Sequence, residues 1–202
     1  MLIQATARLM NEELDRAGAD ALAGFGDLFL HWNQRINLGG LLTPENFVSR
    51  HLLDAFAARR FLASGDHAID VGSGGGLPAL PLAVLCPDVR FDLHEPTGKK
   101  VAFLRTAVRA LGLGGRVSVN AARVEVPLAA GLGGRFDVAL SRATFAPADW
   151  LALGRALVKS AGRVLVFAAG NSGSALPSPS HSRAYASDRR LLVFGQASPD
   201  LR

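Results

Sequence analysis

The sequence predicts an α/β fold in which a mostly parallel sheet has helices on both faces and follows an N-terminal helical extension. From residue 67 onward, short apolar runs alternate with helical segments, as in chains built from βαβ units. Before that point, apolar residues recur at spacings of three and four, the period of an amphipathic helix. We therefore expect one structural unit, with a helical extension over residues 1–64 packed on a core domain over residues 65–202.

Composition narrows the class of protein. The chain has 202 residues, of which 49% are hydrophobic and 19% charged, as in a folded globular domain. No apolar run has the length of a membrane span, and Met1–Asp15 lacks the pattern of a secretory signal, so we expect a cytoplasmic protein. Cys86 is the only cysteine, which excludes an intramolecular disulfide and a cysteine-rich zinc site; we expect no metal. The net charge of +5 is consistent with a nucleic-acid partner without requiring one.

The extension is expected to contain two main helices. Residues 20–37 place their apolar side chains on one face, which predicts a packing helix. Thr43 and Pro44 are typical of a helix start, with Thr as the N-cap and Pro in the first turn. A second helix is therefore expected over residues 47–62.

Strands and helices alternate through the core domain. The strands expected up to residue 170 are Ala68–Val71, Val89–His94, Val117–Ala121, Phe136–Leu140 and Val164–Phe167. The helices expected between them are Leu77–Leu85, Lys99–Leu111, Pro147–Lys159 and a shorter, weaker one near Ala129. The Ser- and Pro-rich residues 171–183 are interpreted as a loop, and Arg190–Phe194 as a last strand. Right-handed crossovers place the carboxyl ends of parallel strands at one edge, where we expect the ligand site.

A glycine-rich segment follows the first expected strand and precedes a helix. It reads Asp70-Val71-Gly72-Ser73-Gly74-Gly75-Gly76, and its glycines allow a sharp turn and a close approach of the main chain to a ligand. A dinucleotide-binding loop would have glycine at position 77, where this chain has Leu77. Nicotinamide-dependent oxidoreduction is therefore disfavoured. A turn without a ligand is the alternative for this loop.

The pattern D-x-G-x-G-x-G resembles motif I of the class I (Rossmann-like) methyltransferases. In those enzymes the loop wraps the amino-acid end of S-adenosyl-L-methionine, which is thus the expected cofactor. Glu95 ends the next expected strand, at the distance where an acidic side chain accepts hydrogen bonds from two ribose hydroxyls. The alternative for Glu95 is a solvated carboxylate at a strand end.

An ordered series of short motifs accompanies the glycine loop. The series is Trp32-Asn33-Gln34-Arg35-Ile36-Asn37-Leu38, Arg50-His51-Leu52-Leu53-Asp54, Leu77-Pro78, Lys99-Lys100, Arg123-Val124-Glu125 and Ser141-Arg142-Ala143. From about residue 25 to residue 170 it resembles the bacterial ribosomal RNA small subunit methyltransferase G family, also called glucose-inhibited division protein B. The resemblance implies N7-methylation of a specific guanine in 16S ribosomal RNA, with that RNA or the small ribosomal subunit as partner. We expect a monomer.

The resemblance also implies roles for particular residues. Gly72 and Leu77 would contact the cofactor, Val124 and Glu125 would flank its adenine, and Arg142 would lie beside the sulfonium or the substrate. Surface placement is the alternative for Glu125, and a surface ion pair for Arg142. The residues expected to bind the cofactor are Asp70, Gly72, Gly74, Gly76, Leu77, Glu95, Val124, Glu125 and Arg142, of which Arg142 would also position the reactants.

Basic residues near the strand ends are candidates for RNA binding. Lys99 and Lys100 open a helix on the ligand edge, where they could contact phosphate. Arg50, His51 and Arg123 are further candidates. The alternative for Arg50 and His51, together with Asp54, is a capping and packing cluster that joins the helices of the extension to the core.

Three features depart from the pattern of the family. Gly39 stands where the family usually has Thr, and Ala169-Gly170 stands where it has Lys-Gly after the fifth strand. The segment before the final strand is short and rich in Ser and Pro. These departures affect the C-terminal part of the substrate surface and leave the expected cofactor site unchanged.

The chemistry implied by the family needs few catalytic groups. Guanine N7 has an in-plane lone pair, so no general base must remove a proton, and alignment of the reactants is the main requirement. Cys86 precedes Pro87 at a helix end, away from the ligand edge, which disfavours thiolate attack on cytosine. A small-molecule methyltransferase and a non-catalytic module that binds S-adenosylmethionine stay open as alternatives. Weak, salt-insensitive RNA binding would favour the first, and cofactor binding without methyl transfer the second.

Overall fold

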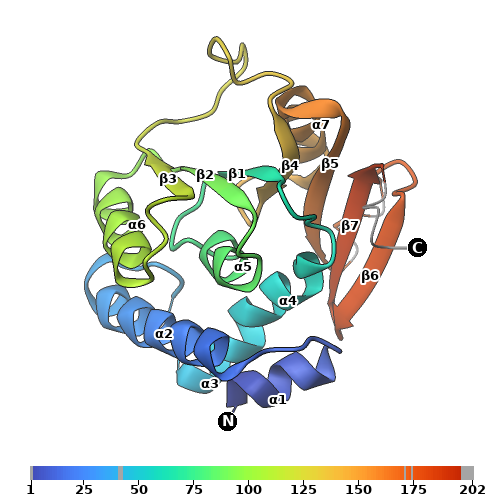
Figure 1. Ribbon diagram of the computed structural model, residues 1–202. Coiled ribbons are helices and arrows are strands. Elements are labelled where there is room, and N and C mark those ends of the chain that lie inside the picture. The colour runs from blue at the N-terminus through green and yellow to red at the C-terminus, as the bar shows by residue number, and fades with distance from the viewer. Residues whose placement is uncertain (1, 41–42, 171, 174, 197–202) are drawn as a thin grey trace.

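The computed structural model describes residues 2–40, 43–170, 172–173 and 175–196. The described residues form a seven-stranded sheet with the order β3-β2-β1-β4-β5-β7-β6 (Figure 1). Neighbouring strands from β3 to β5 pair in parallel, and β7 runs antiparallel between β5 and β6. The strands are β1 (His67–Val71), β2 (Arg90–His94), β3 (Val117–Asn120), β4 (Phe136–Ser141), β5 (Val158–Ala169), β6 (His181–Ala186) and β7 (Arg189–Gly195). The predicted α/β fold with a mostly parallel sheet is confirmed.

Helices cover both faces of this sheet. They are α1 (Leu2–Leu9), α2 (Arg16–Ile36), α3 (Pro44–Phe47), the π-helical turn η1 (Val48–Leu52), α4 (Leu53–Arg59), α5 (Ala79–Leu85), α6 (Gly98–Ala110) and α7 (Pro147–Leu157). Successive residues of a strand point to opposite faces. In β5, Leu165 therefore joins the buried apolar cluster of α2, α4, α5 and α6, while Val164 and Val166 join the cluster of α7.

The N-terminal extension forms through local caps and an aromatic contact surface. Asp15 caps α2, where its side chain accepts a hydrogen bond from the Gly18 N–H at 2.7 Å. Thr43 caps α3 as predicted and accepts from the Asn46 N–H at 3.2 Å. Phe29 of α2 lies edge-on to Phe103 of α6, with ring centroids 5.8 Å apart. The extension thus packs directly on the helices of the core (Figure 1).

Most predicted elements are confirmed, with shifted ends. The helix predicted over residues 47–62 is interrupted by η1 and ends at Arg59. The weak helix predicted near Ala129 is wrong, because the described chain between β3 and β4 forms turns and extended segments that project beyond the sheet (Figure 1). Glycines at positions 131, 133 and 134 disfavour a helix there.

The loop predicted over residues 171–183 is wrong at its C-terminal end. β6 begins at His181 and pairs with β7, which supplies the hydrogen bonds that a lone polar segment could not provide for itself. Residues 171 and 174 lie outside the described residues. None of the helices in the described ranges has both the length and the apolar character of a membrane span.

Candidate functional site

Two adjoining cavities open at the edge of the sheet where the parallel strands end. The hairpin cavity, about 1040 Å³, lies between the loops after β1 and β4, the turn η1 and the β6–β7 hairpin. The β2–β3 cavity, about 760 Å³, lies between the same two loops and the segments after β2 and β3. Gly72, Lys100 and Thr144 line both cavities. A ligand in one cavity could therefore extend into the other.

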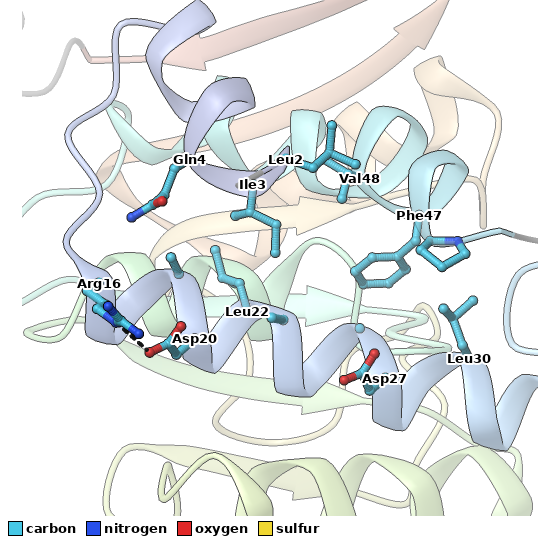
Figure 2. Close-up of a pocket in the computed structure, with 14 residues that line it drawn as sticks. Leu2, Ile3, Gln4, Arg16, Asp20, Leu22, Asp27, Leu30, Phe47 and Val48 are labelled. Atoms are coloured by element: carbon cyan, nitrogen blue, oxygen red, sulfur yellow. Dashed lines mark ion pairs between the residues drawn. The ribbon is translucent and has the colours of Figure 1, made fainter.

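A third hollow lies elsewhere, on the N-terminal extension. It has a volume of about 460 Å³ and is enclosed by α1, α2 and α3 (Figure 2). Ile3, Leu22 and Phe47 give it a mainly apolar lining, and its charged pair, Arg16 with Asp20, lies at one end. The described residues that line it belong to α1, α2, α3 and η1, away from the carboxyl ends of the parallel strands, where polar groups for a ligand are usually positioned.

The glycine loop adopts main-chain conformations that other residues avoid. Gly72, Gly74 and Gly76 have φ values of +74°, +54° and +73°. A Cβ atom on Gly72 would lie 2.4 Å from Thr144 Oγ1, and one on Gly76 would lie 2.5 Å from Leu80 Cδ1. A Cβ atom on Gly74 would meet only the Gly72 carbonyl oxygen, 3.8 Å away. Gly72 and Gly74 thus face the hairpin cavity, whereas Gly76 packs against the core.

Glu95 fastens the glycine loop to the end of β2. Its Oε2 atom accepts a hydrogen bond from the Gly74 N–H at 2.9 Å, and its Oε1 atom accepts from the Thr97 N–H at 2.8 Å. The residue is 4% exposed, so it is not a solvated strand-end carboxylate. Each carboxylate oxygen can accept a further hydrogen bond, which leaves capacity for ligand hydroxyls from the β2–β3 cavity.

Asp70 lies buried beneath the same loop. Neither of its carboxylate oxygens has a hydrogen-bond partner in the described part of the chain, and burial raises its pKa to about 7. Ser73 Oγ donates to the main-chain oxygen of Asp70 at 3.0 Å. A buried carboxylate without a donor is costly, so a positively charged ligand above the loop would stabilise its ionised form.

Arg142 follows β4 and faces the hairpin cavity. Its Nη1 atom donates to His51 Nδ1 at 2.8 Å and to Asp54 Oδ2 at 2.7 Å. Burial, and then the charges of Arg142, Arg189 and Arg50, lower the pKa of His51 to about 3, so its ring is neutral. His51 therefore serves as an acceptor that orients Arg142, and at 8% exposed it is mostly closed to RNA.

The N-terminal extension shapes the rim of the hairpin cavity. Asn33 Oδ1 accepts from the Leu38 N–H at 2.6 Å and from the Gly39 N–H at 2.9 Å, which fixes the turn after α2. Gly39 lines the cavity. A Cβ atom on Gly75 would lie 2.4 Å from Phe29 Cε2, so α2 presses directly on the glycine loop.

The structure separates the remaining predicted residues. Lys100 is half-buried and lines both cavities, whereas Lys99 is exposed and lines neither. The β2–β3 cavity is lined by Arg123, Val124 and Glu125. Val124 is buried, whereas the side chains of Arg123 and Glu125 are exposed and form an ion pair, with Nε and Oε1 3.5 Å apart. Arg50 and Leu77 line the hairpin cavity.

Cys86 caps the end of α5, where burial raises its pKa to about 11. It lines neither cavity at the carboxyl edge. Among the described residues, no three His, Cys, Asp or Glu side chains are grouped so as to hold a metal ion.

Sequence reasoning missed Tyr185 and Arg189, which line the hairpin cavity from the β6–β7 hairpin. Arg189 pairs in register with Ala169, so a cation lies on the neighbouring strand beside the position where this chain departs from the family pattern. No local motif marks either residue. The one available signal was that Tyr185 is the only tyrosine in the chain.

Comparison with known proteins gives a consistent result. The family model described as rRNA small subunit methyltransferase G matches residues 19–176. The ribosomal RNA small subunit methyltransferase G of Stenotrophomonas maltophilia is 40% identical over 152 residues, which cover 75% of this chain and 69% of that protein. The protein of the same name from Xylella fastidiosa is 45% identical over 113 residues, 56% of this chain and 52% of its own length. The match thus spans about half the length of the Xylella relative.

Solved structures share the fold. An S-adenosylmethionine-dependent methyltransferase from Aquifex aeolicus superposes with a TM-score of 0.58 at 14% identity, over 73% of this chain and 91% of that one. Another from Thiobacillus denitrificans, in complex with S-adenosyl-L-homocysteine, gives a TM-score of 0.51 at 17% identity, over 76% and 58% of the two chains. The predicted class I, Rossmann-like fold is confirmed.

Proposed function

The chain belongs to the rRNA small subunit methyltransferase G family, and from that membership we propose that it methylates N7 of a guanine in 16S ribosomal RNA, using S-adenosyl-L-methionine. We place this activity in the cytoplasm, in a monomer that acts on the RNA or on the small ribosomal subunit. One observation carries the proposal: the glycine loop held by Glu95 opens onto the same cavity as Arg142. Light scattering of the purified protein would test the monomer.

The residues around the glycine loop fit the cofactor. S-adenosyl-L-methionine offers two ribose hydroxyls as donors, and positive charge on its ammonium and sulfonium groups. Glu95 has spare acceptor capacity for the hydroxyls, and the unpartnered carboxylate of Asp70 suits positive charge nearby. Gly74 leaves free the space that a Cβ atom would fill. We assign the ribose to Glu95, the methionine end to the loop from Gly72 to Gly76, and the adenine to the neighbourhood of Val124 and Glu125.

When bound, the cofactor supplies an electrophilic methyl group. The task left to the protein is alignment, because guanine N7 is nucleophilic without loss of a proton. Both described contacts of the Arg142 side chain use Nη1, which leaves its Nε and Nη2 atoms for the substrate. Guanine O6 is a hydrogen-bond acceptor that lies next to N7 on the same edge of the base. An N–H group that donates to O6 would orient the base and leave N7 free. We assign this role to Arg142.

Single-turnover measurement tests the assignment. Small subunits that lack the modification, mixed with enzyme and saturating cofactor, should yield 7-methylguanosine at one position by mass mapping of nucleosides. Arg142→Ala should slow methyl transfer about tenfold or more, while RNA affinity changes less, because an aligning group acts mainly on the rate. Arg190→Ala is the matched control, since Arg190 is an exposed arginine on β7. A methyl group on another base atom, or an unchanged rate for Arg142→Ala, would contradict the proposal.

The pH dependence of the same rate tests the absence of a general base. At saturating cofactor and RNA, the rate should stay level between pH 6 and 9, whereas a catalytic base would give a rising limb. Saturation is needed because burial raises the pKa of Asp70 to about 7, so we expect cofactor affinity to change with pH in this range. A rate that titrates at full saturation would argue for proton removal in the reaction.

RNA binding is proposed to depend mainly on charge. Lys100 and Arg50 line the hairpin cavity, and Arg123 lines the β2–β3 cavity. Lys100→Gln should reduce the slope of log affinity against log salt by about one. Lys159→Gln is the control, since Lys159 pairs with Asp137 near the opposite edge of the sheet, at 2.8 Å. If the RNA affinity of the parent enzyme did not change with salt concentration, that result would favour a small-molecule substrate instead.

A further inference from the structure

The Asp54 carboxylate joins three distant parts of the chain. Its Oδ2 atom accepts from Arg142 Nη1 at 2.7 Å. Its Oδ1 atom accepts from Tyr185 Oη at 2.7 Å and from Arg189 Nη1 at 3.1 Å. Asp54 is 2% exposed, so these donors replace water around the charge. The loop after β4 and both strands of the β6–β7 hairpin therefore meet at one buried group on α4.

A bulge in the hairpin aims Tyr185 at this carboxylate. The register of β6 against β7 shifts between Ala184 and Ala186, which makes Tyr185 the extra residue on its strand. Bulges redirect side chains and are frequent beside active sites. The guanidinium carbon of Arg189 lies 5.5 Å from the centroid of the Tyr185 ring. The hairpin thus presents the two side chains to Asp54 as a stacked pair.

Arg189 also ties the hairpin to the turn η1. Its Nη2 atom donates to the Ser49 carbonyl oxygen, and its Nη1 atom to the Arg50 carbonyl oxygen, each at 2.6 Å. The same turn carries His51, and α4, which follows it directly, carries Asp54. These are the two groups that hold Arg142. By fixing this turn, Arg189 fixes both of them.

The division of the carboxylate between its two oxygens limits how it can turn. With Oδ1 occupied by the hairpin, Oδ2 is left to Arg142, in one orientation. Burial and the charge of Asp54 raise the pKa of Tyr185, so its hydroxyl stays protonated and keeps donating. Without the two hairpin donors, the carboxylate could rotate and Arg142 would lose its fixed direction into the cavity.

We propose that Tyr185 and Arg189 are positioning residues that hold Arg142 in the hairpin cavity through the Asp54 carboxylate. The effect on methyl transfer rests on the function proposed above, whereas the effect on Arg142 itself does not.

Conservative variants test the effect on the reaction. Tyr185→Phe removes one hydroxyl and keeps the ring. Arg189→Lys keeps the charge but replaces the two donor nitrogens of the planar guanidinium with a single ammonium nitrogen. Each should lower the single-turnover rate about three- to tenfold at saturating RNA and cofactor, with both dissociation constants within about twofold. The matched controls are Ser182→Ala and Arg190→Lys, exposed residues on the same strands, which should keep the parent rate.

A double-mutant comparison separates positioning from general support of the fold. If Tyr185 acts through Arg142, Tyr185→Phe should slow the reaction in the parent and have no further effect on an Arg142→Ala enzyme. Equal slowing in both backgrounds would overturn the proposal, because a structural contribution would add independently.

The mobility of the Arg142 guanidinium gives a readout that needs no activity. In nitrogen-15 NMR of arginine side chains, assigned by comparison with Arg142→Lys, Arg142 should show restricted rotation in the parent and faster rotation in Tyr185→Phe and Arg189→Lys. Unchanged rotation in both variants would overturn the proposal, whatever the enzyme does. Faster rotation in the variants of a parent that transfers no methyl would support the positioning and reject the proposed function.

Discussion

The glycine loop and the hairpin cavity share one edge of the sheet but are held in different ways. The loop is fixed by a side-chain acceptor from a nearby part of the chain: Glu95 accepts from the Gly74 N–H of the loop, 21 residues away. The hairpin cavity is fixed by charged side chains, and Asp54 joins partners 88, 131 and 135 residues away. The first arrangement follows from one β-α-β unit, whereas the second needs the whole chain to be folded.

The largest effect is expected from removing Asp54, the carboxylate that holds the hairpin side, that is, the charged side chains around the hairpin cavity. Asp54→Ala leaves Arg142 and Arg189 without their shared counter-charge, and each of these side chains is only 22% exposed. Removing one partner of a buried ion pair costs about 3 to 5 kcal/mol of the free energy of unfolding. Urea unfolding measures the loss, with Asp188→Ala, an exposed carboxylate beside Arg189, as the control. A loss below about 1 kcal/mol would mean that the hairpin side does not depend on this charge.

A pair of glycine variants tests the loop side, that is, the glycine loop over residues 72–76. Gly72→Ala combines a positive φ with a clash at Thr144 Oγ1, 2.4 Å away, and should lower the free energy of unfolding by about 3 kcal/mol. Gly74→Ala has the φ penalty alone, about 1 to 2 kcal/mol, but places its methyl group in the proposed cofactor space. Calorimetry should therefore show lost cofactor binding in a Gly74→Ala protein that still folds. Thr144→Ala should recover part of the stability lost in Gly72→Ala, and no recovery would contradict the clash.

Glu95→Ala measures the link between loop and cofactor. The change removes the acceptor of Gly74 and of the proposed ribose contact, so cofactor affinity should fall by about 1 to 3 kcal/mol. Isothermal titration calorimetry checks it, and Glu125→Ala, an exposed carboxylate on the β2–β3 cavity, should lose less. Equal losses in the two variants would argue against a special role for Glu95.

The raised pKa of Asp70 predicts that the free energy of unfolding depends on pH, and this dependence arises from the loop side alone. Burial raises its pKa from 3.8 to about 7, so between these values the folded chain keeps a proton that the unfolded chain releases. The free energy of unfolding should therefore fall as pH rises through this window, by at most about 1.4 kcal/mol per pH unit. Asp70→Asn should flatten this dependence and be more stable than the parent at pH 8. Parallel curves for parent and variant would show that Asp70 ionises normally.

Cofactor binding should respond in the opposite direction. The ionised form of Asp70 attracts positive charge, so affinity for S-adenosyl-L-methionine should rise as pH increases through about 7. The Asp70→Asn protein should lack this rise.

The sequence alone predicted the fold class, the strands β1 to β5 and the glycine loop, because these depend on local properties. Short apolar runs are typical of the buried strands of a parallel sheet, and a glycine run after a strand indicates a turn with positive φ. The family resemblance rests on the same kind of local motif. The right-handed crossover rule predicted a ligand site at the carboxyl edge of the sheet, and the two cavities lie at that edge.

The tertiary structure decided what local pattern could not. His181–Ala186 became a strand because β7 supplied its partner, and the segment near Ala129 stayed irregular because its glycines disfavour a helix. Tyr185 and Arg189 reached Asp54 through a bulge and a hairpin that bring together residues more than 130 positions apart. A charge network of this kind has no period in the sequence, because its geometry exists only after the sheet, the turn η1 and α4 have packed.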